Sequence, residues 1–338
     1  MNIRNIKQIH HTARQSLASN RGHAGTAALI YSGSICLLAL ISTVVSWYLN
    51  QQIAGTGGLS NMGLRSILAT IDYILPFVQV IVSMGLGLGY CALALDVARH
   101  RNARPATLLE GFYRFFPLLR SALLQGVIFV GLATVCMYIS SWIFMMLPAS
   151  KAFYEIMTPY LESLSVLNSE LVLDEATLMA AASTMTPMVI IFAVVFCLAA
   201  LPVSYQYRMV SYCLLDSDRP GAFAALRESR IMMRRNRFAL FRLDLSFWWY
   251  YLLEALAVVI CYGDMLLPLV GVSLPWSGTV SYFLFLVLSL GVQFLVYFLF
   301  MNRIQVTYAT AYEAIRPKPQ RGGVALGNIF DLARDQRN

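Results

Sequence analysis

Charged residues are scarce in this 338-residue chain, where they make up 12% of the sequence, about half of what a soluble protein carries. Hydrophobic residues make up 58%, and the mean hydropathy is +0.64. A single soluble core does not explain these values, because a soluble fold must cover its surface with polar side chains. The composition therefore excludes a soluble enzyme, a disordered chain and a secreted disulfide scaffold, and it predicts a membrane protein.

Several motifs of site chemistry are also missing. The six cysteines all fall within apolar stretches and include no CxxC pair, so neither a disulfide framework nor a zinc site is expected. There is no phosphate-binding GxxxxGK[ST] loop. The pair His10-His11 is interpreted as a solvated helix face, because adjacent helical residues point about 100° apart. We therefore expect no cofactor and no metal.

Six stretches are long and apolar enough to cross a bilayer as helices, which takes about 20 residues. They predict an all-α, polytopic transmembrane bundle. The predicted spans are approximately 24–49, 67–97, 122–147, 187–215, 238–261 and 279–301.

The basic residues predict the orientation, because basic loops resist translocation. Of the 25 Lys and Arg residues, 23 fall on one side of the predicted spans, and only Arg65 and Lys151 fall on the other. Both termini are therefore predicted to be cytoplasmic in a multi-pass protein of the cytoplasmic membrane. Residues 1–316 are predicted to form one six-span domain, with 148–186 as an extracytoplasmic loop and 317–338 as a cytoplasmic tail. This placement of the net charge of +8 favours lipid, and not nucleic acid, as the partner.

A weak internal repetition is visible. The dipeptide Arg-Pro follows each even-numbered span, at 104–105, 219–220 and 316–317. The pattern suggests three units, each a cytoplasmic interfacial helix followed by a hairpin of two spans, over about 1–104, 105–219 and 220–316. Chance similarity is the alternative.

Four arginines before the fifth span are spaced three, four and three residues apart, which on a helix places them on one face. They are Arg227, Arg230, Arg234 and Arg237. We interpret this stripe mainly as an anchor on anionic headgroups of the cytoplasmic leaflet. A site for a phosphorylated ligand or an acidic partner is the alternative, because guanidinium groups bind phosphate with two hydrogen bonds.

Two acidic residues within the predicted spans are candidate sites, because a charge inside the bilayer is costly and persists for a reason. Asp244 is predicted to form an ion pair with Arg208 or Arg303, which lie at a similar depth. Glu254 is deeper and has no basic residue at its level. It is therefore either neutral and hydrogen-bonded within the bundle or exposed to a polar cavity.

Other residues within the spans predict packing and shape. Gly85 and Gly89 form a GxxxG pattern in the second span, which is typical of close helix packing. Pro76 and Pro202 mark possible kinks that would open a cavity.

Several short motifs are distinctive. They are ALRESRIMM at 225–233, NRF at 236–238 and FRLDLSFW at 241–248, together with ARQSL at 13–17 followed by Asn20. In these motifs the chain resembles a bacterial integral-membrane family known as domain of unknown function 975. The sequence departs from the family pattern afterwards, with WWY at 248–250 and LPL at 267–269 where the family tends to have Gly-Trp and Pro-Tyr. The resemblance implies a multi-span membrane protein and no particular activity.

Three classes of function remain. The favoured one is a non-enzymatic bundle that binds or moves a lipid or small amphiphile, or that assists a membrane partner or a second copy of itself. The alternative is an ion- or proton-coupled transporter that uses Glu254. An intramembrane enzyme is the least favoured, because the carboxylates in the spans are isolated from any nucleophile, base or metal cluster.

Overall fold

The protein is all-helical in its computed structural model, which describes residues 5–55, 62–101, 103–165, 175–217, 221–269 and 278–316. No β-strand occurs in these ranges. The all-α prediction is therefore confirmed. The predicted tail, 317–338, lies outside the described residues.

The chain divides into two compact units. Unit 1 comprises Met1–Phe115 and Phe238–Asn338, and unit 2 comprises Phe116–Arg237. The helices that make up unit 1 are α1 (Ile6–Ser19), α2 (Arg21–Gly55), α3 (Met62–Ala98), η2 (Pro105–Leu109), α4 (Glu110–Tyr113), α10 (Arg237–Leu245), α11 (Trp248–Cys261), α12 (Gly263–Leu269), α13 (Gly278–Val296), η3 (Tyr297–Met301) and α14 (Asn302–Ile315). Those of unit 2 are α5 (Phe115–Met145), α6 (Pro148–Ser165), α7 (Glu175–Tyr207), α8 (Val210–Asp216) and α9 (Ala222–Met233).

Five helical segments are long and apolar enough to cross a membrane, and α10 with α11 makes a sixth candidate. The five segments are Gly22–Gln52, Ser66–Ala98, Phe115–Met145, Met179–Asp216 and Gly278–Ile315. Each overlaps one predicted span. The number and rough position of the spans could be predicted because a bilayer about 30 Å thick demands a long run of apolar residues.

The sixth candidate differs from the continuous helix that the sequence predicts over 238–261. α10 and α11 meet at an angle of 65°, at a break formed by Ser246 and Phe247. No proline causes it. The Ser246 hydroxyl instead donates to the Leu243 carbonyl oxygen at 2.6 Å, and side-chain hydrogen bonds of this kind to the preceding turn compete with the helical pattern.

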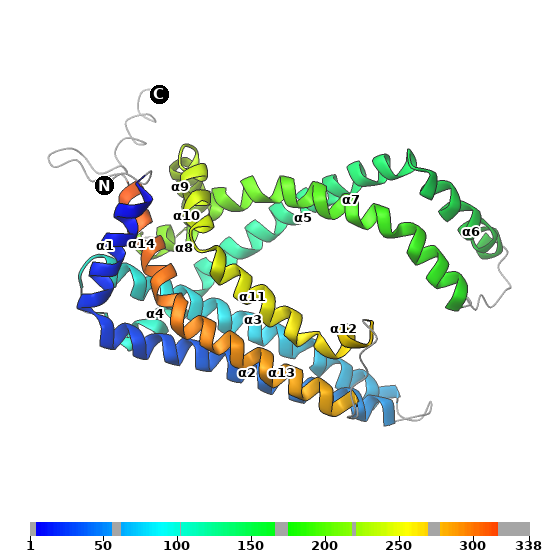
Figure 1. The fold of residues 1–338 in the computed structure, drawn as a ribbon, viewed down its shortest axis with the longest axis horizontal. Coiled ribbons are helices and arrows are strands. Elements are labelled where there is room, and N and C mark those ends of the chain that lie inside the picture. The colour runs from blue at the N-terminus through cyan, green and yellow to red at the C-terminus, as the bar shows by residue number, and fades with distance from the viewer. Residues whose placement is uncertain are drawn as a thin grey trace. The chain divides into compact units, whose positions relative to one another are not determined.

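Unit 1 is a bundle in which segments from the two ends of the chain lie together. α2 packs along α3 and α13, and α11 packs along α13 (Figure 1). α14 packs against α1 and α3, and its side chains Val306, Thr307 and Tyr312 are fully buried there. The core of unit 1 therefore lies at the end of the bundle that α1 and α14 share.

The GxxxG pattern of α3 packs closely against the short helices η2 and α4. A β-carbon placed on Gly89 would lie 1.9 Å from the Leu108 carbonyl oxygen, and one placed on Gly111 would lie 2.0 Å from the Gly85 carbonyl oxygen. The backbones thus approach each other at positions where only glycine fits. The prediction of close packing at Gly85 and Gly89 is confirmed.

Within unit 2, α6 packs on α7, and α9 packs on α7 and α8. The segment 148–186, predicted as an extracytoplasmic loop, contains α6 and the first turns of α7. α7 begins at Glu175, before the predicted start of the fourth span at residue 187. It continues without interruption through Pro187 and Pro202. Proline is tolerated inside spanning helices, where neighbouring groups satisfy the freed carbonyl. The side of the membrane on which 148–186 lies stays a prediction.

The order of the helices fits the proposed three-part repetition. A short helix, α1, precedes α2 and α3. The short helices η2 and α4 precede α5 and α7, and α9 precedes the bent pair and α13. The two compact units cut across this pattern, because unit 1 combines the first and third parts.

Candidate functional site

Glu254 lies in the second turn of α11, six residues after Trp248, the first residue of the helix. Its side chain is half-buried. Its carboxyl group accepts a hydrogen bond from the hydroxyl of Tyr250, one turn earlier. Its Oε1 atom is buried and has no hydrogen-bond partner among the residues that the structure describes. A buried acceptor without a partner is costly, so this oxygen requires an explanation.

Apart from Tyr250 on the same helix, the groups around Glu254 come from two other elements of unit 1, α2 and η3. Tyr31 and Cys36 of α2, Tyr297 of η3 and Tyr250 all lie close enough to Glu254 for their side chains to interact electrostatically with its carboxyl group. Gln293 donates to the Tyr297 hydroxyl at 3.2 Å, and the rings of Tyr31 and Tyr297 lie 6.3 Å apart. We call Glu254, Tyr250, Tyr31, Cys36 and Tyr297 the Glu254 cluster. It combines one carboxyl with three phenol hydroxyls and a thiol inside a helical bundle.

Tyr297 lies in a π-helical turn. The segment η3 interrupts the long helix between α13 and α14, and π-turns of this kind are rare and frequent at functional sites. The extra residue in the turn changes the direction in which the following side chains point. No pattern in the sequence indicates this turn, because residues 279–301 form one uniform apolar run.

Asp244 is buried near the end of α10 and accepts a hydrogen bond from the hydroxyl of Tyr308 in α14. The hydroxyl of Tyr251 lies 3.3 Å from that of Tyr308, which extends the network to α11. Of its two predicted ionic partners, Arg303 lies in the first turn of α14 in unit 1, and Arg208 lies between α7 and α8 in unit 2. The ion pair stays a prediction.

The four arginines of the predicted stripe do not share one helix. Arg227 and Arg230 lie on α9, which ends at Met233, whereas Arg237 begins α10. Arg227, Arg230 and Arg234 are exposed. Arg237 instead donates from both terminal nitrogens to the side-chain oxygen of Gln206, at 3.0 and 2.8 Å, when that amide is oriented toward it.

Sequence reasoning missed a second acidic site within the spans. Asp72 of α3 accepts hydrogen bonds from the Ser46 hydroxyl and, at 3.3 Å, from the Asn50 amide, both in α2. The signal was present, because Asp72 lies within the predicted span 67–97, and Ser46 and Asn50 are one helical turn apart. A further ion pair, Arg99 with Glu313 at 2.6 Å, joins α3 to α14.

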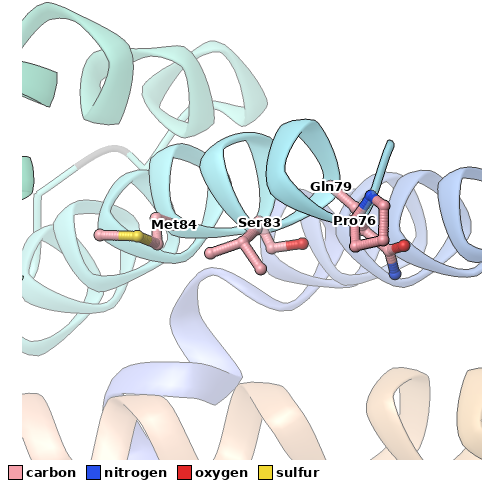
Figure 2. Close-up of a pocket in the computed structure, with 5 residues that line it drawn as sticks. Pro76, Gln79, Ser83 and Met84 are labelled. Atoms are coloured by element: carbon pink, nitrogen blue, oxygen red, sulfur yellow. The ribbon is translucent and has the colours of Figure 1, made fainter. Parts of the chain in front are cut away.

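A hollow of about 500 Å³ runs along one side of α3, and its lining residues all belong to that helix. Figure 2 shows Pro76, Gln79, Ser83 and Met84 along it. Pro76 is among its lining residues, but Glu254 is not, so the cavity that a kink at Pro76 or Pro202 would open beside Glu254 stays a prediction. Among the described residues no group of three or more His, Cys, Asp or Glu side chains is placed to hold a metal ion.

The described helices and the buried polar cluster define the class as an all-helical protein with five or six helices able to span a membrane. Residues 1–318 match a family described as "Protein of unknown function (DUF975)", and the chain belongs to this family. The match bears out the resemblance seen in the sequence. No curated protein and no solved structure shows significant similarity to the chain.

Proposed function

We propose that this protein is a multi-pass protein of the cytoplasmic membrane, with both termini in the cytoplasm, that binds or moves a lipid or small amphiphile. The number of apolar helices and the placement of 23 of 25 basic residues on one side of them support this location. We also propose that it is not an enzyme. The acidic residues of its predicted spans are separated along the sequence from nucleophiles and bases, which supports a binding role.

The observation that carries the proposal is the unpartnered Oε1 atom of Glu254. An acidic side chain inside a membrane bundle usually marks a binding site or a pathway, and binding sites combine apolar walls with a few polar groups. The Glu254 cluster has this composition. A hydroxyl or amine of an amphiphile would donate to Oε1, while the apolar part of the ligand would lie among the surrounding helices.

Native mass spectrometry of the purified full-length chain tests this role. We expect the wild type, after extraction from the membrane, to carry one bound small molecule or lipid. The Glu254→Gln variant should be folded but should not carry this ligand. Asp264→Asn is the matched control, because Asp264 is another half-buried carboxyl of unit 1, on α12. Equal retention by all three proteins would contradict a ligand site at Glu254.

A second candidate function is coupling of transport to an ion or proton at Glu254. Two observations favour it. The carboxyl group accepts a hydrogen bond from the Tyr250 hydroxyl, and its Oε1 atom, which has no partner among the described residues, is left to bind a proton or an ion. In liposomes with a pH gradient, Glu254→Asp keeps an ionisable group and should retain pH-driven uptake, whereas Glu254→Gln should abolish it. Equal uptake by both variants would remove the argument for coupling.

Lipids, and a membrane partner or a second copy, are the proposed partners. The exposed guanidinium groups of Arg227, Arg230 and Arg234 support binding to anionic headgroups. Many large apolar side chains of α5 and α7 are exposed, among them Trp142 and Leu198, which supports contact with lipid tails or with another apolar helix.

A further inference from the structure

In unit 1, α1 packs against α14 (Figure 1), and three basic residues belong to these two helices, His10 and Arg14 to α1 and Arg303 to α14. The charges of Arg14 on α1 and Arg303 on α14 both act on His10 of α1, and the charge of Arg14 also acts on Arg303. Like charges held together repel each other unless an anion neutralises them. Asp244 of α10, a carboxyl of the same unit, accepts a hydrogen bond from Tyr308. We call His10, Arg14 and Arg303 the α1–α14 basic cluster.

Two nitrogen atoms of this cluster are buried without a hydrogen-bond partner among the described residues. They are Nδ1 of His10 and Nε of Arg303. Buried polar atoms are nearly always paired, and an exception in a folded protein commonly marks a place where an ion or water binds. The two atoms belong to α1 and α14, which pack against each other, so we infer that one anionic group at this contact satisfies both.

The hydrogen bonds of His10 indicate which form of the ring binds an anion. The single proton of the Ser246 hydroxyl is donated to the Leu243 carbonyl oxygen at 2.6 Å. His10 Nε2, 2.9 Å from the same hydroxyl oxygen, must therefore be the donor in that contact. In a neutral ring Nδ1 then carries a lone pair, and it becomes a donor only when the ring takes up a proton.

The depth of the cluster suits a headgroup. Arg303 follows Gly278 by 25 helical residues, or about 37 Å at 1.5 Å per residue, which exceeds the ~30 Å hydrocarbon thickness. α1 itself is not one of the apolar candidate spans. The cluster thus lies at the level of phosphate groups and not among the acyl chains.

We propose that the α1–α14 basic cluster binds a phosphate group, held by the guanidinium groups of Arg14 and Arg303 and by the protonated ring of His10. This site is distinct from the predicted stripe at Arg227–Arg237, which belongs to unit 2. It does not depend on the role proposed for Glu254. The phosphate is that of a lipid headgroup or of a soluble compound, and both have the same recognition chemistry.

The test uses the full-length chain in a neutral detergent without phosphate. One arm titrates phosphatidylglycerol, a second titrates its soluble headgroup glycerophosphoglycerol, and diacylglycerol, which has no phosphate, is the control. The rise in unfolding temperature with ligand gives an apparent dissociation constant. We expect saturable binding of at least one phosphodiester, and a difference between the two arms identifies the lipid or the soluble source. Binding by neither compound would overturn the proposal.

Variants separate this site from general surface charge. Arg14→Gln and Arg303→Gln should each weaken binding by about tenfold, the size of one charge-assisted hydrogen bond. Arg242→Gln, at another exposed arginine of unit 1, should stay close to the wild type, as should Glu254→Gln. Arg14 is exposed, so its variant decides the outcome if Arg303→Gln does not fold. An equal loss in Arg242→Gln would overturn the proposal.

The role of His10 has its own measurement. A phosphodiester keeps one negative charge between pH 6 and pH 8, so a change of affinity in this range belongs to the protein. We expect the wild type to bind more tightly at pH 6 than at pH 8, and His10→Gln to lose that difference. A pH dependence that is unchanged in His10→Gln would remove His10 from the site.

Discussion

Gly89 of α3 lies so close to Leu108 of η2 that a β-carbon at position 89 would stand 1.9 Å from the Leu108 carbonyl oxygen. Backbone cannot move away as a flexible side chain can. Gly89→Ala should therefore lower the free energy of unfolding by about 1–3 kcal/mol or more. Gly87→Ala is the matched control on the same helix, because nothing lies within 4 Å of its added carbon. Thermal unfolding in detergent measures both, and equal midpoints would contradict the close packing.

This contact also shows which part of the packing could be predicted from the sequence. The GxxxG pattern is local and predicts that some backbone approaches α3. It does not name the partner, because the contact with Leu108 and Gly111 depends on how η2 and α4 fold back onto α3. The spans, like the GxxxG pattern, could be predicted from local sequence. The thickness of the bilayer sets the length of an apolar helix, and this length does not depend on the neighbouring helices.

Tyr308 is predicted to stabilise Asp244. Replacing Tyr308 with Phe removes the hydroxyl that donates to this buried carboxylate and should cost about 1–3 kcal/mol of folding free energy. Tyr251→Phe should cost less, because Tyr251 is 42% exposed and contacts the hydroxyl of Tyr308. Chemical unfolding of the purified proteins compares them. A larger loss in Tyr251→Phe would show that the network is organised around a different group.

An ion pair of Asp244 with Arg303 or Arg208 is a separate prediction. Asp244→Asn should lower the yield of folded protein, because the partner guanidinium is left without its counter-charge. Neutralising the true partner in the same chain should then restore part of the yield. Losses that simply add for both arginines would contradict the pair.

His10 should make stability depend on pH. Burial, and then the charges of Arg303 and Arg14, hold the pKa of His10 below its ordinary value of 6.5. The contacts around the ring are the Ser246 hydroxyl and the edge-on ring of Phe247. As the pH falls below 6.5, the unfolded chain takes up a proton that the folded chain resists, so the folded state loses stability until the pH passes the lowered pKa.

The unfolding temperature in detergent without anionic lipid measures this effect. The wild type should lose more stability between pH 7.5 and pH 5.5 than His10→Gln does. His11→Gln is the control, because His11 is the next residue of α1 and is exposed. Equal losses in the wild type and His10→Gln would contradict a half-buried ring that resists protonation. Sequence reasoning placed both histidines on a solvated face, which describes His11 but not His10, because burial depends on Ser246 and Phe247, more than 230 residues later.

Topology has a direct test by cysteine labelling in intact cells, on a chain whose six native cysteines are replaced. Cysteine at Glu155 of α6 should react with a membrane-impermeant reagent added from outside. Cysteine at Arg230 of α9 should react only after the membrane is opened. Both positions are exposed, so accessibility to the reagent reports the side of the membrane. The reverse pattern would invert the predicted orientation.

The remaining features of the site could not be predicted, because they join distant segments. The Glu254 cluster unites α2, α11 and η3, and the hydrogen bond to Asp244 comes from a residue 64 positions later. Sequence shows a carboxyl within an apolar run, and this was enough to identify Glu254 and Asp244 as candidates. Which hydroxyl reaches each carboxyl depends on helix packing, as does the break at Ser246 and Phe247.

Unit 1 is made from the two ends of the chain, and this arrangement imposes an order on its synthesis. Cys36 leaves the ribosome roughly 260 residues before Tyr297, which is about 13 to 50 s at ~5–20 residues per second. During that interval α1 and α2 are in place without α14 or η3, while the whole of unit 2 is translated. A nascent chain stalled before residue 254 would therefore hold its first hairpin with the phenol of Tyr31 and the thiol of Cys36 facing no carboxyl. The segment Gly278–Ile315, translated after unit 2, supplies Tyr297 to the Glu254 cluster and Arg303 to the basic cluster, so both should be completed late, and nearly together, in biogenesis.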